Sequence, residues 1–559
     1  MATRHLRPGQ LLLWTAGAVT LAWLVVVVAW RDAPFALTFD DAFYYFGIAR
    51  NVAHGHGSTF DGIDPTNGYH PLWMLMAVPV YAAGLDDTAA VRVLLGLQVV
   101  IYGAALGVVA SVAGRAIREW KRLVSTRPDD GERLARWATA AVAAALAVGG
   151  GNPFVVKIFV NGLESGVLVA LDALVLAVGA RWRGRWLTGG TGRARLGVSA
   201  LLALTILART DSVLLVAALG LWCLFEARPL GRRAIRPIAQ LFALPAATLV
   251  AYLVSNEVQF GIWLQISGIV KREPVTVTRM AVMAVVVALA VAIGRWGVRR
   301  SSGTGGSRRF RRVARFTAST AWYAGFCLVM VAYYQVLQSQ QWPWYYCPVV
   351  VYLLFLLVLG VADLTETAAL EAPRRTSAIR AVGPIVAIIF VPLLVALVLQ
   401  TRTFTDPHLR SIELANRDAG EWINANLPAD AVLASWDAGV VGYFSHRSVI
   451  NLDGVANSNE YYQAARQSGL GRFLTDRSVD GIVNHGIPVD GEDPTIRAFI
   501  SGVFGPEAAS AATMEHAWPF IYSGETTGSS GSSSGTRNLA VFLYLLSSGG
   551  HRDVAATPG

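Results

Sequence analysis

Long apolar segments separated by short basic stretches dominate the first 400 residues of the chain. An apolar run of about 20 residues is long enough to cross the hydrocarbon layer of a membrane as a helix. The apolar segment 71–84 is shorter, which favours an interfacial or re-entrant helix. The pattern predicts eleven membrane spans, several of them short, near residues 11–30, 91–114, 137–151, 162–180, 196–208, 212–227, 238–255, 276–294, 316–337, 348–363 and 381–400.

The pattern changes after residue 400. Residues 409–426 have the spacing of an amphipathic helix, and short apolar stretches predict strands at 431–436, 448–452, 481–484 and 539–546. Residues 523–537 are rich in Gly and Ser, which is typical of a flexible loop. The chain is therefore expected to be a polytopic α-helical membrane protein over 1–400, with a first outer loop at 31–90, followed by a C-terminal α/β domain over 401–559.

The composition agrees with a membrane protein, because 54% of the 559 residues are hydrophobic and only 15% are charged. The net charge of +10 does not indicate a nucleic-acid partner, since most Arg residues lie in short loops between the apolar segments. Placing the N-terminus in the cytoplasm puts 29 Lys and Arg on the inner face and about eight on the outer face before residue 400. The positive-inside rule then predicts an extracytoplasmic C-terminal domain. Scarce Lys with abundant Ala and Arg favours a bacterial inner (plasma) membrane protein.

Two adjacent acids, Asp40 and Asp41, stand at the start of an amphipathic helix in the first outer loop. A carboxylate in the first turn of a helix is stabilised by the helix dipole and can cap the helix. The same carboxylate, held at the membrane boundary, can act as a general base that takes a proton from a hydroxyl group. Both interpretations stay open on local grounds.

The motifs DDAFYYFGIARN at 40–51 and TNGYHPLW at 66–73 resemble membrane glycosyltransferases of the GT-C superfamily. The similarity is to the bacterial branch that includes protein mannosyltransferases and lipid A aminoarabinose transferase. It implies a helical bundle, an active site on the outer face, a polyprenyl-phosphate sugar donor and an acidic catalytic base in this loop. We assign the base to Asp40 or Asp41, and favour Asp40 because it begins the helix and is expected to face the cavity. His70, before a proline, matches a His-Pro motif of the family.

Further polar and aromatic residues are candidates for substrate binding. Ionisable residues at membrane depth are costly and are often functional, and cations on the outer face can offset the charge of a phosphate leaving group. Arg209 is our first choice for the phosphate. An alternative for each of these residues is an ordinary structural or interfacial role. The full set is Tyr44, His70, Lys157, Glu164, Arg209, Asp211, Lys271, Arg272, Trp344 and Tyr345.

The resemblance implies an inverting transfer of a hexose or pentose to a glycan, glycolipid or protein acceptor of the cell envelope. No cofactor is required by the sequence, although Asp40, Asp41 and Glu164 could hold a divalent cation through oxygen ligands. Acids that follow the predicted strands, Asp437 and Asp453, are either turn residues or acceptor-binding residues. The alternatives are a transporter or flippase for a lipid-linked sugar and a non-catalytic envelope assembly protein.

Overall fold

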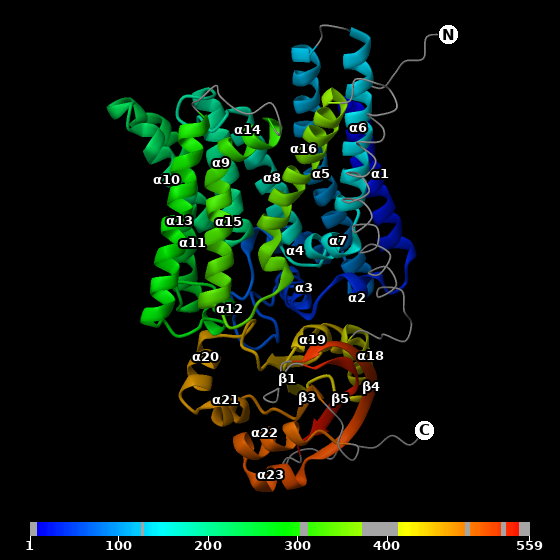
Figure 1. Ribbon diagram of the computed structural model, residues 1–559. Coiled ribbons are helices and arrows are strands. Elements are labelled where there is room, and N and C mark those ends of the chain that lie inside the picture. Colours follow the sequence, from blue (N-terminus) through cyan, green and yellow to red (C-terminus); the bar gives the residue numbers. More distant parts are fainter. Residues whose placement is uncertain are drawn as a thin grey trace.

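A bundle of long helices with a smaller domain of helices and strands at one end makes up the molecule (Figure 1). The computed structural model describes residues 8–124, 128–301, 311–371, 412–486, 492–526 and 533–546. The predicted span 381–400 lies outside the described residues. The bundle contains α1 (Pro8–Ala29), α2 (Ala33–Leu37), α3 (Asp40–Ala53), α4 (Pro71–Ala82), α5 (Asp87–Val124), α6 (Pro128–Gly150), α7 (Pro153–Phe159), α8 (Ser165–Arg181), α9 (Gly192–Ala208), η1 (Thr210–Ser212), α10 (Val213–Ala227), η2 (Gly231–Ala234), α11 (Ile235–Phe260), α12 (Ile266–Val270), α13 (Val277–Ser301), α14 (Arg311–Ser319), α15 (Ala321–Leu337), η3 (Pro343–Tyr346) and α16 (Cys347–Glu371).

Within the described residues, six helical stretches are long and apolar enough to cross a membrane. They contain α1, α5, α10, α11, α13 and α16, and the bent pairs α6–α7 and α14–α15 raise the number to eight. The helices α8 and α9 coincide with two further predicted spans but have only 17 residues each. The chain is thus a polytopic helical membrane protein, and the predicted total of eleven spans stays a prediction.

Burial separates the central helices from the peripheral ones. The apolar parts of α16 and α5 are 61% and 50% buried, whereas that of α13 is only 6% buried, which leaves most of α13 free to face lipid. The short helices α8 and α9 bring charged residues inside the bundle. Glu164 precedes α8 and Arg209 follows α9, and both side chains are buried. Buried charges in a membrane bundle need partners, which the candidate site supplies.

The segment predicted as the first outer loop, residues 31–90, folds into α2, α3 and α4. Both predicted acids, Asp40 and Asp41, lie in the first turn of α3, and the helix buries eight consecutive residues from Ala42 to Ala49. The helix α4 has 12 residues and is too short to cross a membrane, as the length of segment 71–84 predicts. The segment therefore packs at one end of the bundle and does not add a span.

The C-terminal domain is a five-stranded mixed sheet with helices around it. Its strand order is β2-β1-β3-β5-β4, with β1 parallel to β2 and β3, and β5 antiparallel to β3 and β4. The core on one face packs Ile482, Phe542 and Tyr544 against the surrounding helices. The elements are α18 (Ile412–Asn426), β1 (Val432–Ser435), α19 (Ala438–Ser445), β2 (Ser448–Asn451), α20 (Asn459–Arg466), α21 (Leu470–Asp476), β3 (Gly481–Gly486), α22 (Pro494–Phe504), α23 (Pro506–Ala511), β4 (Thr513–Thr526) and β5 (Ser533–Leu545).

The prediction of a flexible loop over 523–537 is wrong for its described ends. Strand β4 continues to Thr526 and β5 begins at Ser533, with Ser523 paired to Thr536 across the hairpin. Backbone hydrogen bonds form the ladder, so Gly and Ser residues can extend it without contributing apolar side chains. The sequence pattern also missed β4, which carries Pro519 and a register shift between Met514 and His516.

The domain and the bundle meet through a junction that contains both aromatic and polar contacts, and the ring of Phe43 packs against that of Tyr443. The helix α3 packs against α19, and the Arg477 guanidinium contacts Asp64 through Nε at 2.6 Å. The Arg50 guanidinium donates to the carbonyl oxygen of Tyr443 at 2.9 Å. The junction therefore fixes the sheet domain against residues 31–90, where the candidate site lies.

Candidate active site

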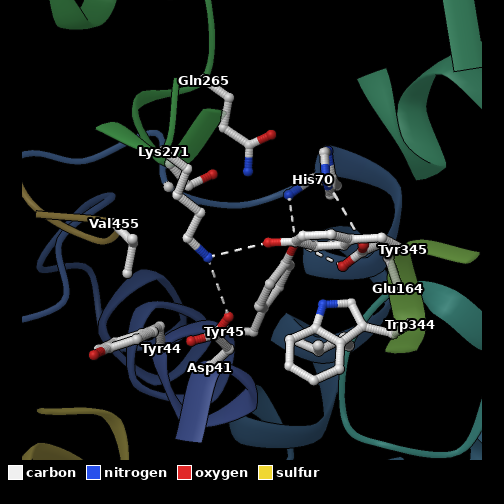
Figure 2. Close-up of a pocket in the computed structure, with 13 residues that line it drawn as sticks. Asp41, Tyr44, Tyr45, His70, Glu164, Gln265, Lys271, Trp344, Tyr345 and Val455 are labelled. Carbon is white, nitrogen blue, oxygen red and sulfur yellow. Dashed lines mark hydrogen bonds and ion pairs between the residues drawn. The ribbon is translucent and has the colours of Figure 1, made fainter. Parts of the chain in front are cut away.

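A small cavity of about 70 Å³ lies between the end of the bundle that carries α3 and the C-terminal domain. Residues from α3, the loop before α4, the start of α8, the segment around α12 and η3 line it, and the C-terminal domain contributes one residue (Figure 2). Segments that are far apart in the sequence thus line one cavity. The lining residues are Asp41, Tyr44, Tyr45, Gly68, His70, Leu163, Glu164, Gln265, Ser267, Lys271, Trp344, Tyr345 and Val455.

Lys271 joins one acidic and one aromatic residue at the cavity (Figure 2). Its Nζ lies 3.6 Å from Asp41 Oδ2 and donates a hydrogen bond to the Tyr345 hydroxyl at 3.2 Å. Burial lowers the pKa of Lys271, but Asp41 and Tyr345 raise it by more, so the net pKa is raised and the ammonium stays charged. The Asp41 side chain is 31% exposed, which leaves it accessible to a ligand.

A second polar group, centred on Glu164, forms the side of the cavity next to His70. The Tyr45 hydroxyl donates to Glu164 Oε2 at 2.9 Å and accepts a hydrogen bond from the His70 backbone N–H at 2.9 Å. His70 Nε2 is 3.8 Å from Glu164 Oε1. Burial lowers the pKa of His70 more than Glu164 raises it, so the imidazole is neutral at pH 7. Its buried Nδ1 has no hydrogen-bond partner among the described residues.

Arg209 lies behind this group and does not line the cavity. Its guanidinium contacts Asp211 at 2.8 Å and Glu164 at 3.6 Å, and donates to the Tyr334 hydroxyl at 2.6 Å and to the Trp344 carbonyl oxygen at 3.2 Å. Two carboxylates therefore already compensate the charge of Arg209. This arrangement favours Arg209 and Asp211 as supports for Glu164 and Trp344.

Asp40 has a different environment from the one that its place at the helix start predicts. Its Oδ2 accepts a hydrogen bond from the Gly439 N–H and its Oδ1 from the Val440 N–H, both at 2.8 Å. The carboxyl group thus caps α19 of the C-terminal domain and does not line the cavity. Burial and the nearby Asp437 raise the pKa of Asp40 well above its ordinary value, against the lowering effect of the two N–H groups. The expectation that Asp40 faces the cavity is corrected to Asp41.

The other predicted residues divide between the cavity and its surroundings. Tyr44 lines the cavity with its ring, and its hydroxyl accepts the Ala438 N–H at 3.0 Å. Lys157 lies 4.5 Å above the ring of Phe39, outside the lining. Arg272 is exposed and also lies outside the lining.

The sequence interpretation missed Tyr45, Gln265 and Ser267 as lining residues. Helix spacing could have indicated Tyr45, because it stands four residues after Asp41 and shares its helix face. Gln265 precedes the short helix α12 and Ser267 lies within it, and this stretch has no recognisable motif, so only the folded chain places them at the cavity.

The divalent cation that we considered has no set of ligands at Asp41 and Glu164 among the described residues. The group of acidic and His residues that is close enough to hold a metal ion is Asp86, Asp87 and His446, at the junction. The guanidinium group of Arg50 lies next to these residues, 3.5 Å from Asp86 and 3.3 Å from His446 Nδ1. A positive charge there opposes metal binding, and we derive no step through a metal ion.

Comparison with known proteins gives a family match for the C-terminal region alone. Residues 406–534 match a family described as a domain of unknown function (DUF8728). No curated protein matches the chain.

Two similar solved structures are those of ArnT from Cupriavidus metallidurans, each 13% identical to the chain. The structure in the apo state has a TM-score of 0.46 and covers 93% of this chain and 98% of that chain. The structure bound to undecaprenyl phosphate has a TM-score of 0.49, with 94% and 97% covered. Because both TM-scores are below 0.5, the functional proposal rests on the geometry of the site.

Proposed function

We propose that the chain is a GT-C-type glycosyltransferase that moves a sugar from a polyprenyl-phosphate donor to a hydroxyl group of a cell-envelope acceptor. The observation that carries the proposal is the pairing of Asp41 with Lys271 at a cavity between the membrane bundle and the C-terminal domain. A carboxylate and a fixed cation side by side supply the two charges that such a transfer needs. The proposed reaction takes place on the extracytoplasmic face, with the N-terminus in the cytoplasm.

Lys271 is the proposed binding group for the donor phosphate. Cleavage of the bond between the anomeric carbon and the phosphate oxygen leaves negative charge on the departing polyprenyl phosphate. A preorganised cation next to that oxygen stabilises the charge in the transition state. Lys271 fits this role because it lines the cavity and stays protonated, whereas Arg209 is already held by two carboxylates.

Asp41 is the proposed general base. As the acceptor oxygen bonds to the anomeric carbon, its proton passes to the Asp41 carboxylate, and the electron pair of the broken bond stays on the phosphate. Attack from the side opposite the phosphate gives inversion of configuration.

The remaining lining residues orient the substrates in this proposal. His70 is neutral, and Glu164 and Tyr45 hold it in place at the cavity. Trp342 stacks on Trp344 with ring centroids 5.1 Å apart, which gives an aromatic wall for the sugar ring or the prenyl chain.

Donor binding requires the cavity to enlarge. A volume of about 70 Å³ is far below the roughly 300 Å³ or more of typical small-molecule sites. The connecting segment that carries Gln265 and Lys271 or the C-terminal domain must therefore move outward as the donor enters from the bilayer.

Substitution of the two neighbouring acids tests the proposal. In membranes supplied with labelled polyprenyl-phosphate sugars and envelope acceptors, Asp41→Asn is expected to lower transfer at least about 100-fold, because general-base catalysis contributes about 10²–10⁴-fold. Its thermal stability should stay near that of the wild type. Asp40→Asn should instead lower stability, since one oxygen that accepts an N–H is lost, and should lower transfer less than Asp41→Asn does, because the proposed base is intact.

The exposed Asp476, whose side chain is paired with Arg472 on α21, provides a matched control through Asp476→Asn. Transfer by Asp41→Asn at the wild-type rate would exclude Asp41 as the base. Passage of labelled donor across vesicles without any transfer by the wild type would instead support the transporter alternative and overturn the proposed enzyme.

A further inference from the structure

Three adjacent parallel strands of the C-terminal domain end at the edge that faces the site. Asp437 follows β1, Asp453 follows β2 and His485 lies near the end of β3. The chain passes from β1 to β2 on one side and then to β3 on the other, so the strand order reverses between β1 and β3. Ligands of open parallel sheets bind outside the carboxyl ends of the strands at such a switch point.

This edge reaches the proposed active site. Val455, two residues after Asp453, lines the cavity together with Asp41 and Lys271. A Cβ atom on Gly68 would lie only 2.9 Å from the Cα of Ala456, so the bundle and this loop are in tight contact. The loop after β2 therefore forms part of the cavity wall.

Asp437 is held at this edge in an unusual conformation. Its φ of 43° lies in the left-handed region, which is uncommon for residues other than Gly but is tolerated best by Asn and Asp. The Asp437 N–H donates to Asp453 Oδ2 at 2.8 Å, and α19 begins directly afterwards, where Asp40 caps its N–H groups. Contacts from both domains therefore fix the backbone at Asp437, and strained backbone of this kind is often found at functional sites.

The side chain of Asp437 is left open for a ligand. It is 47% exposed, and His485 Nδ1 lies 3.7 Å from its Oδ2. Burial lowers the pKa of His485, so at pH 7 the imidazole is neutral and does not cancel the Asp437 charge. Burial and then the charge of Asp41 raise the pKa of Asp437 to about 6, so the carboxyl group is mostly ionised at pH 7.

We propose that Asp437 binds the acceptor, as a specificity-determining residue that accepts a hydrogen bond from a second hydroxyl group of a polyhydroxylated acceptor. The inference rests on the proposed function, in which Asp41 takes the proton of the reacting hydroxyl. The donor phosphate does not suit this edge, because Asp437, Asp453 and Asp41 would repel an anion. Sugar hydroxyls are hydrogen-bond donors and suit a row of carboxylates that borders water.

The experiment compares Asp437→Asn and Asp437→Ala with Asp476→Asn in the full-length protein. The probes are a labelled polyprenyl-phosphate sugar pool and octyl glycosides, each with a matched analogue that lacks one ring hydroxyl. Loss of a hydrogen bond to a charged group is expected to raise the acceptor KM about 10- to 100-fold. The donor KM should not change, and Asn keeps both the size and the left-handed backbone.

If Asp437 had only a structural role, its substitution would not alter the preference of the enzyme between the parent glycoside and its deoxy analogue. We expect the wild type and Asp476→Asn to prefer the parent, and both Asp437 variants to lose the preference for one particular hydroxyl. An unchanged acceptor KM and unchanged preference in folded Asp437 variants would overturn the inference while transfer by the wild type still supports the enzyme. Absence of transfer by the wild type with every probe would overturn both.

Discussion

Gly439 provides a direct test of the junction that places Asp41 beside the C-terminal domain. A Cβ atom at this position would collide with the backbone oxygen of Asp40 and lie 2.8 Å from its Oδ2. The nearest atom belongs to the backbone of α3, so rotation of a side chain cannot relieve the contact. Gly439→Ala is therefore expected to push α19 away from α3.

The expected loss of stability follows from the contacts that the displacement of α19 would break. The Asp40 carboxyl group accepts two N–H bonds, from Gly439 and Val440, each at 2.8 Å. Each such bond contributes about 1–3 kcal/mol, the larger value applying to the ionised carboxylate, so the junction would lose about 2–6 kcal/mol. The same substitution favours the helix itself by up to about 1 kcal/mol. Any loss of stability must then come from the junction and not from α19.

Hydrogen exchange measures this effect at the level of single amides. A loss of 2 kcal/mol corresponds to about 30-fold faster exchange, and we expect at least this acceleration at Val440. Sugar transfer should fall in parallel. Gly502→Ala in α22 is the matched control, because a Cβ atom there meets no atom within 4 Å. Equal exchange and equal transfer in the two variants would refute the role of Asp40 and Gly439 in docking.

Two further predictions concern the first outer loop. Burial raises the pKa of Asp61 from 3.8 to about 6, so the folded state holds this proton more tightly. The stabilisation, up to about 3 kcal/mol, is present below about pH 4 and is lost as the pH rises through 6. Asp61→Asn should reduce the change in Tm between pH 4.5 and 7.5 in detergent, and an unaltered pH profile would contradict this. Arg477→Ala should destabilise the protein by about 3–5 kcal/mol, because it leaves the buried Asp64 without its bidentate partner. Arg472→Ala, at a side chain that is 86% exposed, should cost less than about 1 kcal/mol in the same denaturation experiment, and equal losses would exclude a structural role for the Asp64 pair.

The sequence predicts the fold well where the signal is local. Ten of the predicted spans coincide with described helices or bent pairs, because an apolar run of sufficient length has few alternatives to a membrane helix. Strands β1, β2 and β3 are also found where short apolar runs predict them. Strand β4 has no such signal, since its pairing with β5 depends on backbone hydrogen bonds and includes a register shift.

The sequence predicts which types of residue form the candidate site, but not which individual residues line the cavity. Asp41, Glu164 and Lys271 line one cavity, whereas Asp40 and Arg209, the first choices for the base and for the phosphate, do not line it. Arg209 differs, because Asp211 and Glu164 occupy its guanidinium in the folded chain. A structural role for Arg209 is the alternative that the sequence leaves open, and the packing of α8 and α9 decides between the two roles.

The choice between Asp40 and Asp41 shows why the sequence alone does not identify the residues that line the cavity. Successive residues of a helix point about 100° apart, so two adjacent acids cannot face the same partner. The α19 N–H groups that Asp40 binds come from residues 399 and 400 positions later in the chain. Once they hold Asp40, the neighbouring acid is turned toward Lys271 and the cavity. The two carboxyl groups are therefore coupled: one fixes the C-terminal domain, and that contact sets the direction of the other. A change that weakens the first should impair transfer even when Asp41 is intact.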